Sequence, residues 1–412
     1  MNFKNYIENK FTELINVSPE FQNNSNIFTE IGFPTFKDEN WKYTPMHFLF
    51  KNEFSLIGAS VQIDKVKIIE YLEQLYIPEN SIIYLLKNGE LFEFETSKLD
   101  PSCLIVETEN EYIKEFQIDT SKMNNNVFEL LNNSFSEKKI TFHLKNESVP
   151  IVILNVANDS NQFVNNNLSF LTEAYAKSEI FLYSVNTGET NFLNSKININ
   201  LAENSQLKLN LVPMDEKENY TINNIEITQN NNSDLTINNF NMKSKFIRNN
   251  FQANLNGQGI ESKLFGLFIG KNNSVVDNHI NFDHNEPNCH SNQFFKGIIE
   301  DTSRGVFNGK IHVKKDAQKT DAYQTNRNIL TSKEASIFTK PELEIYADDV
   351  KCSHGATSGF LQENELFYLM SRGLGMVESK SLLLKAFANE VIDKIEDEPF
   401  REWLRAKLDE VI

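Results

Sequence analysis

The sequence predicts a mainly β protein, a stacked β-solenoid flanked by helical regions at its two ends. Between about residues 151 and 349, short runs of alternating apolar and polar residues dominate, and helical periodicity is nearly absent. Asparagines, often in pairs or triplets, separate these runs. A serine that precedes a strand-like run recurs along the same stretch, mostly at intervals of about 30 residues. Short strands that repeat at such a period favour a solenoid over a sandwich.

The first part of the chain mixes helices with a hairpin. We expect an amphipathic helix before Ser18-Pro19, because the residue before a proline disfavours helical angles. An aromatic-rich segment, Asn40 to Pro45 (NWKYTP), follows it. Ile63 to Leu75 has helical periodicity, and Ser81 to Glu95 is typical of a β-hairpin whose turn is Asn88-Gly89.

The repeated pattern of the central region also predicts its corners. Asparagine tolerates left-handed backbone angles, so asparagines between the runs suit tight corners. A general bias toward asparagine would explain its number but not its position at strand ends. The recurring serines are Ser178, Ser205, Ser233, Ser274, Ser303 and Ser336.

After Gly359 the periodicity becomes helical. We expect a helix from Glu363 that Gly373 caps, a second from Glu378 to Ile395, and a last one that begins at Pro399. These helices either cap the end of the solenoid or present an apolar face to a partner. Three regions are therefore expected: a helical and mixed region, 1–150; a β-solenoid core, 151–359; and a C-terminal helical region, 360–412.

Composition and charge exclude several classes of protein. The chain has 412 residues and a net charge of −17, so it repels nucleic acid and anionic membrane surfaces. Three cysteines, Cys103, Cys289 and Cys352, are too few for a disulfide framework or a four-cysteine cluster site. No apolar run is long enough to span a bilayer, and the first residues do not resemble a signal peptide. We expect a cytoplasmic protein that binds neither membrane nor nucleic acid.

Two candidate metal ligands stand in the segment KCSHGAT, Lys351 to Thr357. If the strand-like run before it continues, Cys352 and His354 project to the same face and Ser353 to the other. A thiolate and an imidazole suit iron or zinc, but two ligands cannot complete a site. The residues alone favour a structural interpretation, a buried cysteine beside a hydrogen-bonded histidine.

A second segment, His279 to Gln293, concentrates three histidines and a cysteine. His279, His284 and either Cys289 or His290 could surround a metal if the segment folds back on itself. Cys289 and His290 are adjacent, so an extended backbone would point them in opposite directions. Structural histidines and a small buried thiol are the favoured interpretation here as well.

Four long, collinear motifs stand in the second half of the chain: Phe295 to Val313, Ala317 to Leu330, Lys340 to Gly359 and Leu366 to Leu374. They resemble the SufB/SufD family of the SUF iron–sulfur cluster assembly system. The N-terminal NWKYTP is also similar to a segment found near the start of related chains. A cysteine that accepts sulfur in the SufB branch has no counterpart here, because Asn326 or Arg327 occupies its place. The chain therefore resembles the branch that is the partner of SufB.

The resemblance implies both a fold and a role. It implies a right-handed parallel β-helix that pairs with a SufB-like subunit and binds a SufC-like ATPase through its C-terminal helical region. An iron–sulfur cluster would form transiently at the subunit interface, with none bound permanently. His354 would be the metal-binding residue there, and Cys352 an accessory candidate. The chain itself would be a non-catalytic scaffold.

Two alternatives remain open at this point. One is a stand-alone β-solenoid enzyme that acts on carbohydrates, and the other is a SufB-like scaffold that acts as a homodimer. The sequence contains no phosphate-binding loop and none of the common hydrolase motifs, so it predicts no catalytic residue. A homodimer in isolation is also compatible with the resemblance.

Overall fold

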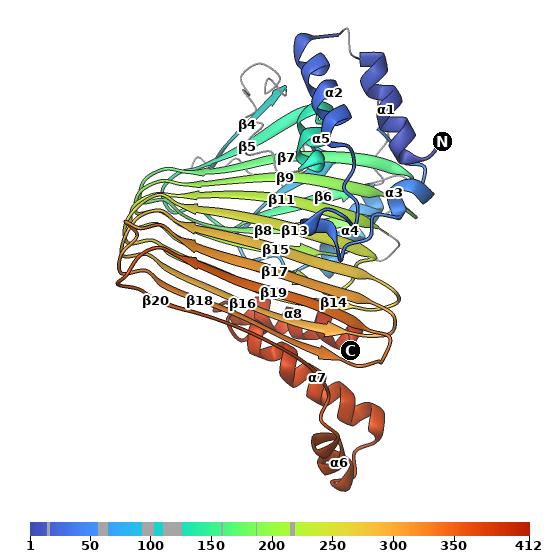
Figure 1. Cartoon of the computed structure of the whole chain (residues 1–412), viewed down its shortest axis with the longest axis vertical. Helices are drawn as coiled ribbons and strands as arrows, with labels where there is room; N and C mark the ends of the chain where they lie inside the picture. Colours follow the sequence, from blue (N-terminus) through green and yellow to red (C-terminus); the bar gives the residue numbers. More distant parts are fainter. Residues whose placement is uncertain are drawn as a thin grey trace.

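A tall stack of parallel strands, arranged as two facing sheets, occupies the centre of the molecule (Figure 1). The computed structural model describes residues 1–14, 17–56, 65–92, 103–109, 126–157, 160–186, 188–214 and 219–412. We call the two sheets A and B. The strands of sheet A are β1 (Ser55–Leu56), β4 (Cys103–Glu109), β5 (Lys138–Leu144), β7 (Gln162–Thr172), β9 (Phe192–Leu201), β11 (Tyr220–Gln229), β13 (Phe246–Leu255), β15 (Val275–His284), β17 (Arg304–Val313) and β19 (Ser336–Ile345). The strands of sheet B are β2 (Ile82–Lys87), β3 (Glu90–Phe92), β6 (Ile151–Ala157), β8 (Lys177–Asn186), β10 (Gln206–Pro213), β12 (Asp234–Asn241), β14 (Glu261–Gly270), β16 (His290–Ile299), β18 (Asp321–Leu330) and β20 (Lys351–Phe360).

Each turn of the stack places one strand in sheet A and the next strand in sheet B. From β5 and β6 onward, every strand pairs in parallel with the strand two positions along the chain. Alternate side chains therefore point into the space between the sheets, where isoleucine, leucine and phenylalanine form a continuous core. The predicted class, a mainly β parallel solenoid with helices at both ends, is confirmed.

Asparagine and serine build the corners, as the sequence pattern predicts. Asn204 and Asn232 have φ angles of 58° and 55°, each just before a strand of sheet B. The next residue in each corner is a buried serine that donates its hydroxyl hydrogen back across the corner. Ser205 donates to the Ala202 carbonyl oxygen, and Ser233 to that of Asn230, both at 2.7 Å.

Helices from the N-terminal part cover the outer face of sheet A. Helix α5 contacts β7 and β9, and phenylalanines of the helices pack with Phe163, Phe192 and Phe246 of the sheet. Ser18 caps the second helix and Pro19 opens it, so the predicted break at this dipeptide is confirmed. The helices on sheet A are α1 (Phe3–Leu14), α2 (Pro19–Ile31), the short 3-10 helix η1 (Glu39–Trp41), α3 (Phe48–Lys51) and α5 (Val127–Phe135), whereas α4 (Lys65–Gln74) packs against sheet B.

The predicted hairpin and the helix before it are also present. Asn88 and Gly89 both have positive φ angles, which is the conformation of a tight turn between β2 and β3. Helix α4 matches the expected helical stretch. Residues 63 and 64 of that stretch, and 93 to 95 of the hairpin segment, lie outside the described residues.

The segment Asn40 to Pro45, which we call the strap, crosses the outer face of sheet A. The Trp41 ring is 4% exposed and lies 3.7 Å from the Arg248 guanidinium carbon. Arg248 donates hydrogen bonds to the Asn40 carbonyl oxygen and to Asp277, both at 2.7 Å. The Thr44 hydroxyl donates to the same carboxylate. The ion pair is fully enclosed, so the strap is anchored by charge as well as by apolar contact.

Three helices follow the solenoid: α6 (Glu363–Ser371), α7 (Met376–Ile392) and α8 (Glu398–Val411). Gly373, with a φ of 98°, ends the first of them as predicted. Leu384, Phe400 and Leu404 are buried against the outer face of sheet B, together with residues of α4. Helices α7 and α8 therefore cover a face of the sheet and not the end of the stack.

The division of the chain into three regions, with boundaries after residues 150 and 359, stays a prediction. Strand β5 already pairs with β7, and β2 with β6, so both sheets begin before residue 151. Strand β20 ends at Phe360, where the helical part begins. In the part of the chain that is described, none of the helices combines the length and apolarity needed to cross a bilayer.

Candidate functional site

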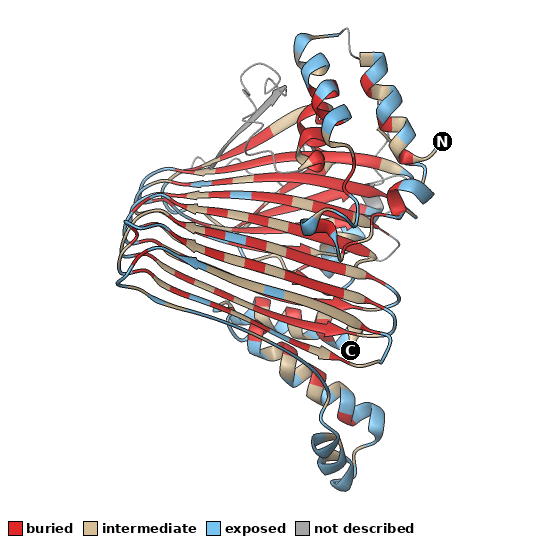
Figure 2. Cartoon of the chain, viewed as in Figure 1, coloured by how far each residue is buried: buried red, intermediate tan, exposed pale blue. Residues whose placement is uncertain are grey.

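The last turn of the solenoid, β19 and β20, is uncovered. These strands end the two sheets, and no described strand pairs with their outer edges. Most of β20 is exposed and β19 is largely half-buried, whereas the strands in the middle of the stack are buried (Figure 2). Backbone donors and acceptors along such an edge are available to another chain.

Pairing with β18 determines where the side chains of β20 point. Cys352 lies opposite Ala322, and His354 lies opposite Gln324. Ala322 and Gln324 are buried in the solenoid interior, whereas Tyr323 between them is 38% exposed on the outside. Cys352 and His354 therefore share the interior-facing side of β20, which is the same-face arrangement expected from their spacing.

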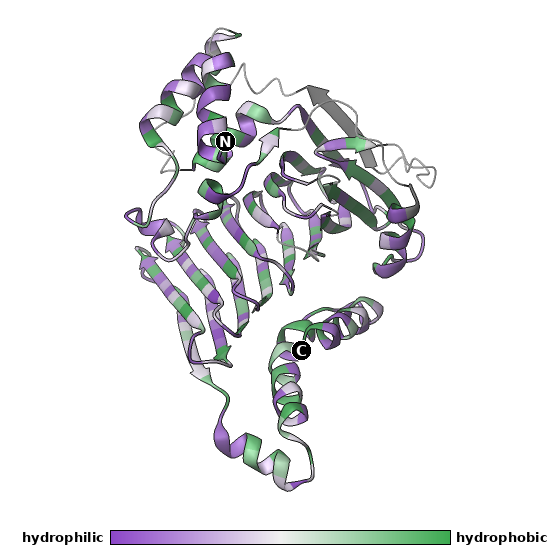
Figure 3. Cartoon of the chain, turned by 90° about the vertical axis from the view of Figure 1, so that its right-hand side faces the viewer, coloured by the Kyte–Doolittle hydropathy of each residue, from purple (hydrophilic) through white to green (hydrophobic). Residues whose placement is uncertain are grey.

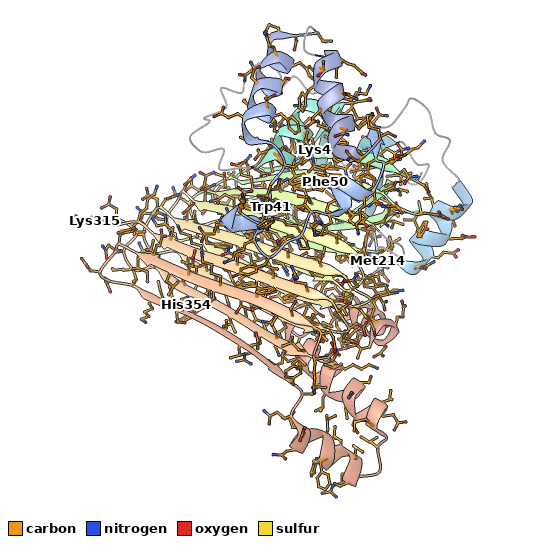
Figure 4. The ribbon with its side chains drawn as sticks, turned by 45° about the vertical axis from the view of Figure 1, so that its right-hand side comes forward. Lys4, Trp41, Phe50, Met214, Lys315 and His354 are labelled. Carbon is orange, nitrogen blue, oxygen red and sulfur yellow. The ribbon has the colours of Figure 1, made fainter. Side chains whose placement is uncertain are left out.

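The two candidate ligands differ in their surroundings. His354 lies on the last strand of the stack (Figure 4), and its ring is exposed because no further turn covers it. Cys352 is half-buried and packs against a small apolar cluster that includes Ile311 and Ala322. Burial raises the pKa of the Cys352 thiol, and a hydrogen bond from the Ala322 backbone offsets part of this rise. The exposed imidazole is therefore the more accessible of the two ligands, whereas the thiol must first lose its proton.

The chain offers an incomplete metal site at this edge. Within the described ranges, no three or more His, Cys, Asp or Glu side chains are grouped so as to hold a metal ion. A soft thiolate and a borderline imidazole can bind iron, but they leave coordination positions open. A stable site at this edge requires ligands from another molecule.

The histidines of the second candidate segment are separated by the fold. The segment forms β15, a corner and β16, so its side chains are distributed over three environments. His279 lies on the outer face of sheet A, with Nε2 3.1 Å from Asp277 Oδ1. His284 points into the interior and shares a 2.9 Å hydrogen bond with Ser291. His290 lies on the outer face of sheet B, with Nδ1 3.0 Å from Glu261.

Cys289 is buried in the corner between these strands. Its sulfur lies 3.1 Å from the Gly257 carbonyl oxygen, and burial raises the pKa of the thiol. The segment does not fold back as a metal site would require. A ten-residue strand on each side of the corner carries His279 and His290 to opposite faces of the molecule.

A second exposed feature lies on the helices that leave the solenoid. Helix α6 has no buried residue, and it extends away from the stack (Figures 1 and 3). Several large apolar side chains of α6 and the first half of α7 face solvent, and we call them the α6–α7 surface. Its members and exposed fractions are Phe367 (75%), Tyr368 (57%), Met370 (41%), Met376 (47%), Val377 (81%) and Leu382 (49%).

Sequence reasoning missed the buried group around the strap. Arg248 and Asp277 are fully buried, and each comes from a different strand of sheet A. Arg248 is the one charged residue in its strand-like run, FIRNNFQANL, and Asp277 directly follows two valines; these placements are the signal that could have identified them.

Comparison with known proteins places the whole chain among iron–sulfur assembly proteins. Residues 155–387 match the family model described as SUF system FeS cluster assembly, SufBD core domain. The chain is 27% identical over 410 residues to the iron–sulfur cluster assembly protein SufD of Escherichia coli, which covers 95% of this chain and 92% of that protein. It is 29% identical over 397 residues to an iron–sulfur cluster assembly SufBD family protein of Synechocystis, covering 91% of this chain and 86% of the relative.

Proposed function

Because this chain belongs to the SufBD family of the SUF iron–sulfur cluster assembly system, we propose that it is the SufD-type scaffold subunit of that system. In this proposal it pairs with a SufB-like subunit and binds a SufC-like ATPase. It catalyses no step itself, and ATP hydrolysis belongs to the ATPase. The complex works in the cytoplasm, whose reducing conditions suit the free thiols of Cys289 and Cys352.

The observation that carries the proposal is the half-site on the uncovered last turn. A scaffold must release its cluster, so ligands divided between two chains suit the task better than a closed four-ligand site. His354 is exposed on the final strand, and Cys352 lies two residues before it on the same face. The open edges of β19 and β20 can accept strands of a partner, which would bring the missing ligands to this place.

Within this half-site we assign iron or cluster binding to His354 and an accessory role to Cys352. The imidazole is exposed and lies on the open last strand. The thiol has a raised pKa and gives up apolar contacts when it turns toward a metal. The cluster is cargo that forms at the interface, and the chain holds none of it permanently.

Replacing His354 tests this assignment. The His354→Ala chain, co-expressed with the SufB-like and SufC-like proteins, should assemble into a complex of normal composition. Its iron and sulfide content after reconstitution should fall several-fold below that of the unaltered complex. His290→Ala is the matched control, because it removes a strand histidine from the outer face of sheet B and should leave the cluster yield unchanged. Normal iron and sulfide content in the His354→Ala complex would refute the assignment.

We assign ATPase docking to the α6–α7 surface, because uncovered apolar side chains of this size are typical of interaction sites. Deleting all three helices is a poor test, since Leu384, Phe400 and Leu404 cover sheet B. Point substitutions on the exposed side leave that core intact.

The combined variant Phe367→Ser and Val377→Ser should fold normally and lose co-purification with the SufC-like ATPase. Phe36→Ser is the control, since Phe36 is 76% exposed but belongs to the N-terminal part. Undiminished recovery of the ATPase with the double variant would place the docking site elsewhere.

A further inference from the structure

A row of polar side chains runs through the interior of sheet B and ends at His354. The register aligns Gln293 of β16 with Gln324 of β18, and Gln324 with His354 of β20. The two glutamines are 0% and 1% exposed, in an interior otherwise formed largely by isoleucine, leucine and phenylalanine. A buried amide that lacks a hydrogen-bond partner destabilises the folded chain, so the presence of two stacked amides in this apolar interior calls for a physical explanation.

The amide of Gln324 is held from two sides. Its Nε2 donates a 2.6 Å hydrogen bond to Oε1 of Gln293 in the preceding turn. On the opposite sheet, a Cβ at position 309 would collide with the same nitrogen, so only glycine leaves room for the amide there. Gly309 and Gln293 together fix the plane in which the Gln324 amide lies.

One atom of this amide is left without a partner. Among the described residues, Gln324 Oε1 accepts no hydrogen bond although it is fully buried. The nitrogen and oxygen of a planar amide diverge, and the nitrogen points toward β16. The register places His354 of β20 beside Gln324, on the side of β18 opposite β16, so this unpaired acceptor lies next to the strand that carries the histidine.

Two other histidines show that a strand histidine reaches its neighbour in the preceding turn. His290 lies opposite Glu261 in the register, with Nδ1 3.0 Å from its carboxylate. His312 lies opposite Asp283, with Nδ1 2.9 Å from that carboxylate. Gln324 has the same position relative to His354, but it offers a neutral acceptor in place of a charged one.

We infer that Gln324 is the positioning residue of His354: when the ring turns toward the interior, Oε1, which has no hydrogen-bond partner among the described residues, accepts the N–H of the imidazole and leaves the other ring nitrogen, with its lone pair, facing the open end. Histidines that bind metals commonly donate their second N–H to such an acceptor, which fixes the tautomer and the ring orientation. This inference rests on the proposed role of His354. It adds that the geometry of the half-site is set from inside the solenoid, before any partner binds.

The test is the tautomer of His354 in the full-length chain. Nitrogen-15 labelled histidine and two-bond proton–nitrogen correlation spectra distinguish the two neutral tautomers, and His354→Ala identifies the signal. In the unaltered chain we expect one dominant tautomer. In Gln324→Met, which keeps the length and removes the acceptor, the shifts should move to those of a free imidazole. Gln324→Glu should restore a single tautomer, because it restores the acceptor.

Asn326→Leu is the matched control. Asn326 is buried in the same strand, but its register neighbour is Ala356, so its loss should leave the His354 signal unchanged. If Gln324→Met does not fold, Gln293→Met removes the hydrogen bond that orients Gln324 and should move the same signal. Thermal unfolding of each variant separates loss of stability from loss of positioning.

The two proposals fail in different ways. An unchanged His354 signal in Gln324→Met would overturn the inference, and the role of His354 would still be judged by His354→Ala in the complex. In that complex, Gln324→Met should lower the cluster yield several-fold at limiting iron, and Gln324→Glu should recover it. A full yield with Gln324→Met at limiting iron would also overturn the inference.

Discussion

Among single residues, the chemical effect of burial is clearest at His284, a histidine in the solenoid interior. His284 is 0% exposed and shares its Nε2 with Ser291, while its Nδ1 has no partner among the described residues. Burial lowers the pKa of His284 from 6.5 to about 4. The neutral ring is therefore the form that the folded chain requires.

This shift predicts a loss of stability in mild acid. The unfolded chain binds a proton at His284 below pH 6.5 and the folded chain only below about pH 4. The stabilisation is therefore fully present above pH 6.5 and is lost as the pH falls toward 4. The lost free energy of unfolding should reach about 3 kcal/mol at pH 4. Urea unfolding at pH 7.5 and pH 4.5 should show a smaller pH dependence for His284→Gln than for the unaltered chain.

His354→Ala serves as the control for that comparison, because it also removes one histidine but from the exposed last strand and not from the interior. An equal loss of stability in His284→Gln and the unaltered chain would show that other groups dominate acid unfolding.

At the scale of elements, the strap depends on a buried charge pair. Burial by itself would raise the pKa of Asp277, but Arg248, His279 and the Thr44 hydroxyl reverse this effect, so its pKa is lowered. The carboxylate stays charged at neutral pH and holds both the guanidinium and the strap. Removing one partner leaves the other charge buried without compensation.

Asp277→Ala should therefore lower the free energy of unfolding by about 3–5 kcal/mol in urea titrations. It should also make the chain near Trp41 more sensitive to limited proteolysis. The double variant Arg248→Met with Asp277→Leu, which removes both charges, should be more stable than Asp277→Ala alone. Asp277→Ala with unaltered stability would show that the pair does not anchor the strap.

Elements with a regular period could be predicted from the sequence, and long-range contacts could not. The corners at Asn204 and Asn232 follow from a local property of asparagine, and the shared face of Cys352 and His354 follows from the two-residue period of a strand. The Arg248–Asp277 pair and the Gln293–Gln324 pair join residues 29 and 31 positions apart. Such contacts depend on how the strands of neighbouring turns are aligned. The residue pattern within a single run does not determine that alignment.

The same limit applies to the helices after the solenoid and to the second histidine segment. The periodicity near Leu384 and Phe400 indicated an apolar side but not which surface it covers, so it left end capping open. His279, His284 and His290 were considered as joint ligands because they are close in sequence. The sequence pattern did not locate the corner at residues 285–289. This corner separates the histidines by placing His279 and His284 on β15 and His290 on β16.

At the scale of the whole molecule, the two strands of the last turn are covered to different extents. The strap reaches β19, where Tyr43 stacks on Phe338 at 4.1 Å between ring centroids and Glu39 pairs with Lys340 at 2.7 Å. Among the described residues, no helix lies on β20, most of which is exposed. Stability in a stacked repeat is a sum over neighbouring turns, so the last turn has only one neighbour to hold it.

Hydrogen exchange should follow this arrangement. Backbone amides of β20 should exchange fastest, those of β19 more slowly, and those of β11 and β13 slowest of the four strands. Mass spectrometry of the isolated chain measures this order directly, and adding the SufB-like subunit should protect β19 and β20 in particular. Equal protection of the β20 and β11 amides in the isolated chain would contradict this expected order of exchange.

The corners also have a consequence for how the chain can change length during evolution. All strands from β13 to β20 have ten residues, while the corners between them differ, from residues 271–274 to residues 314–320. One residue added within a strand would turn every following side chain of that strand inside out. One residue added at a corner leaves the alternation within both adjoining strands unchanged. Insertions and deletions should therefore accumulate at the corners, so that relatives of very different length can share one interior.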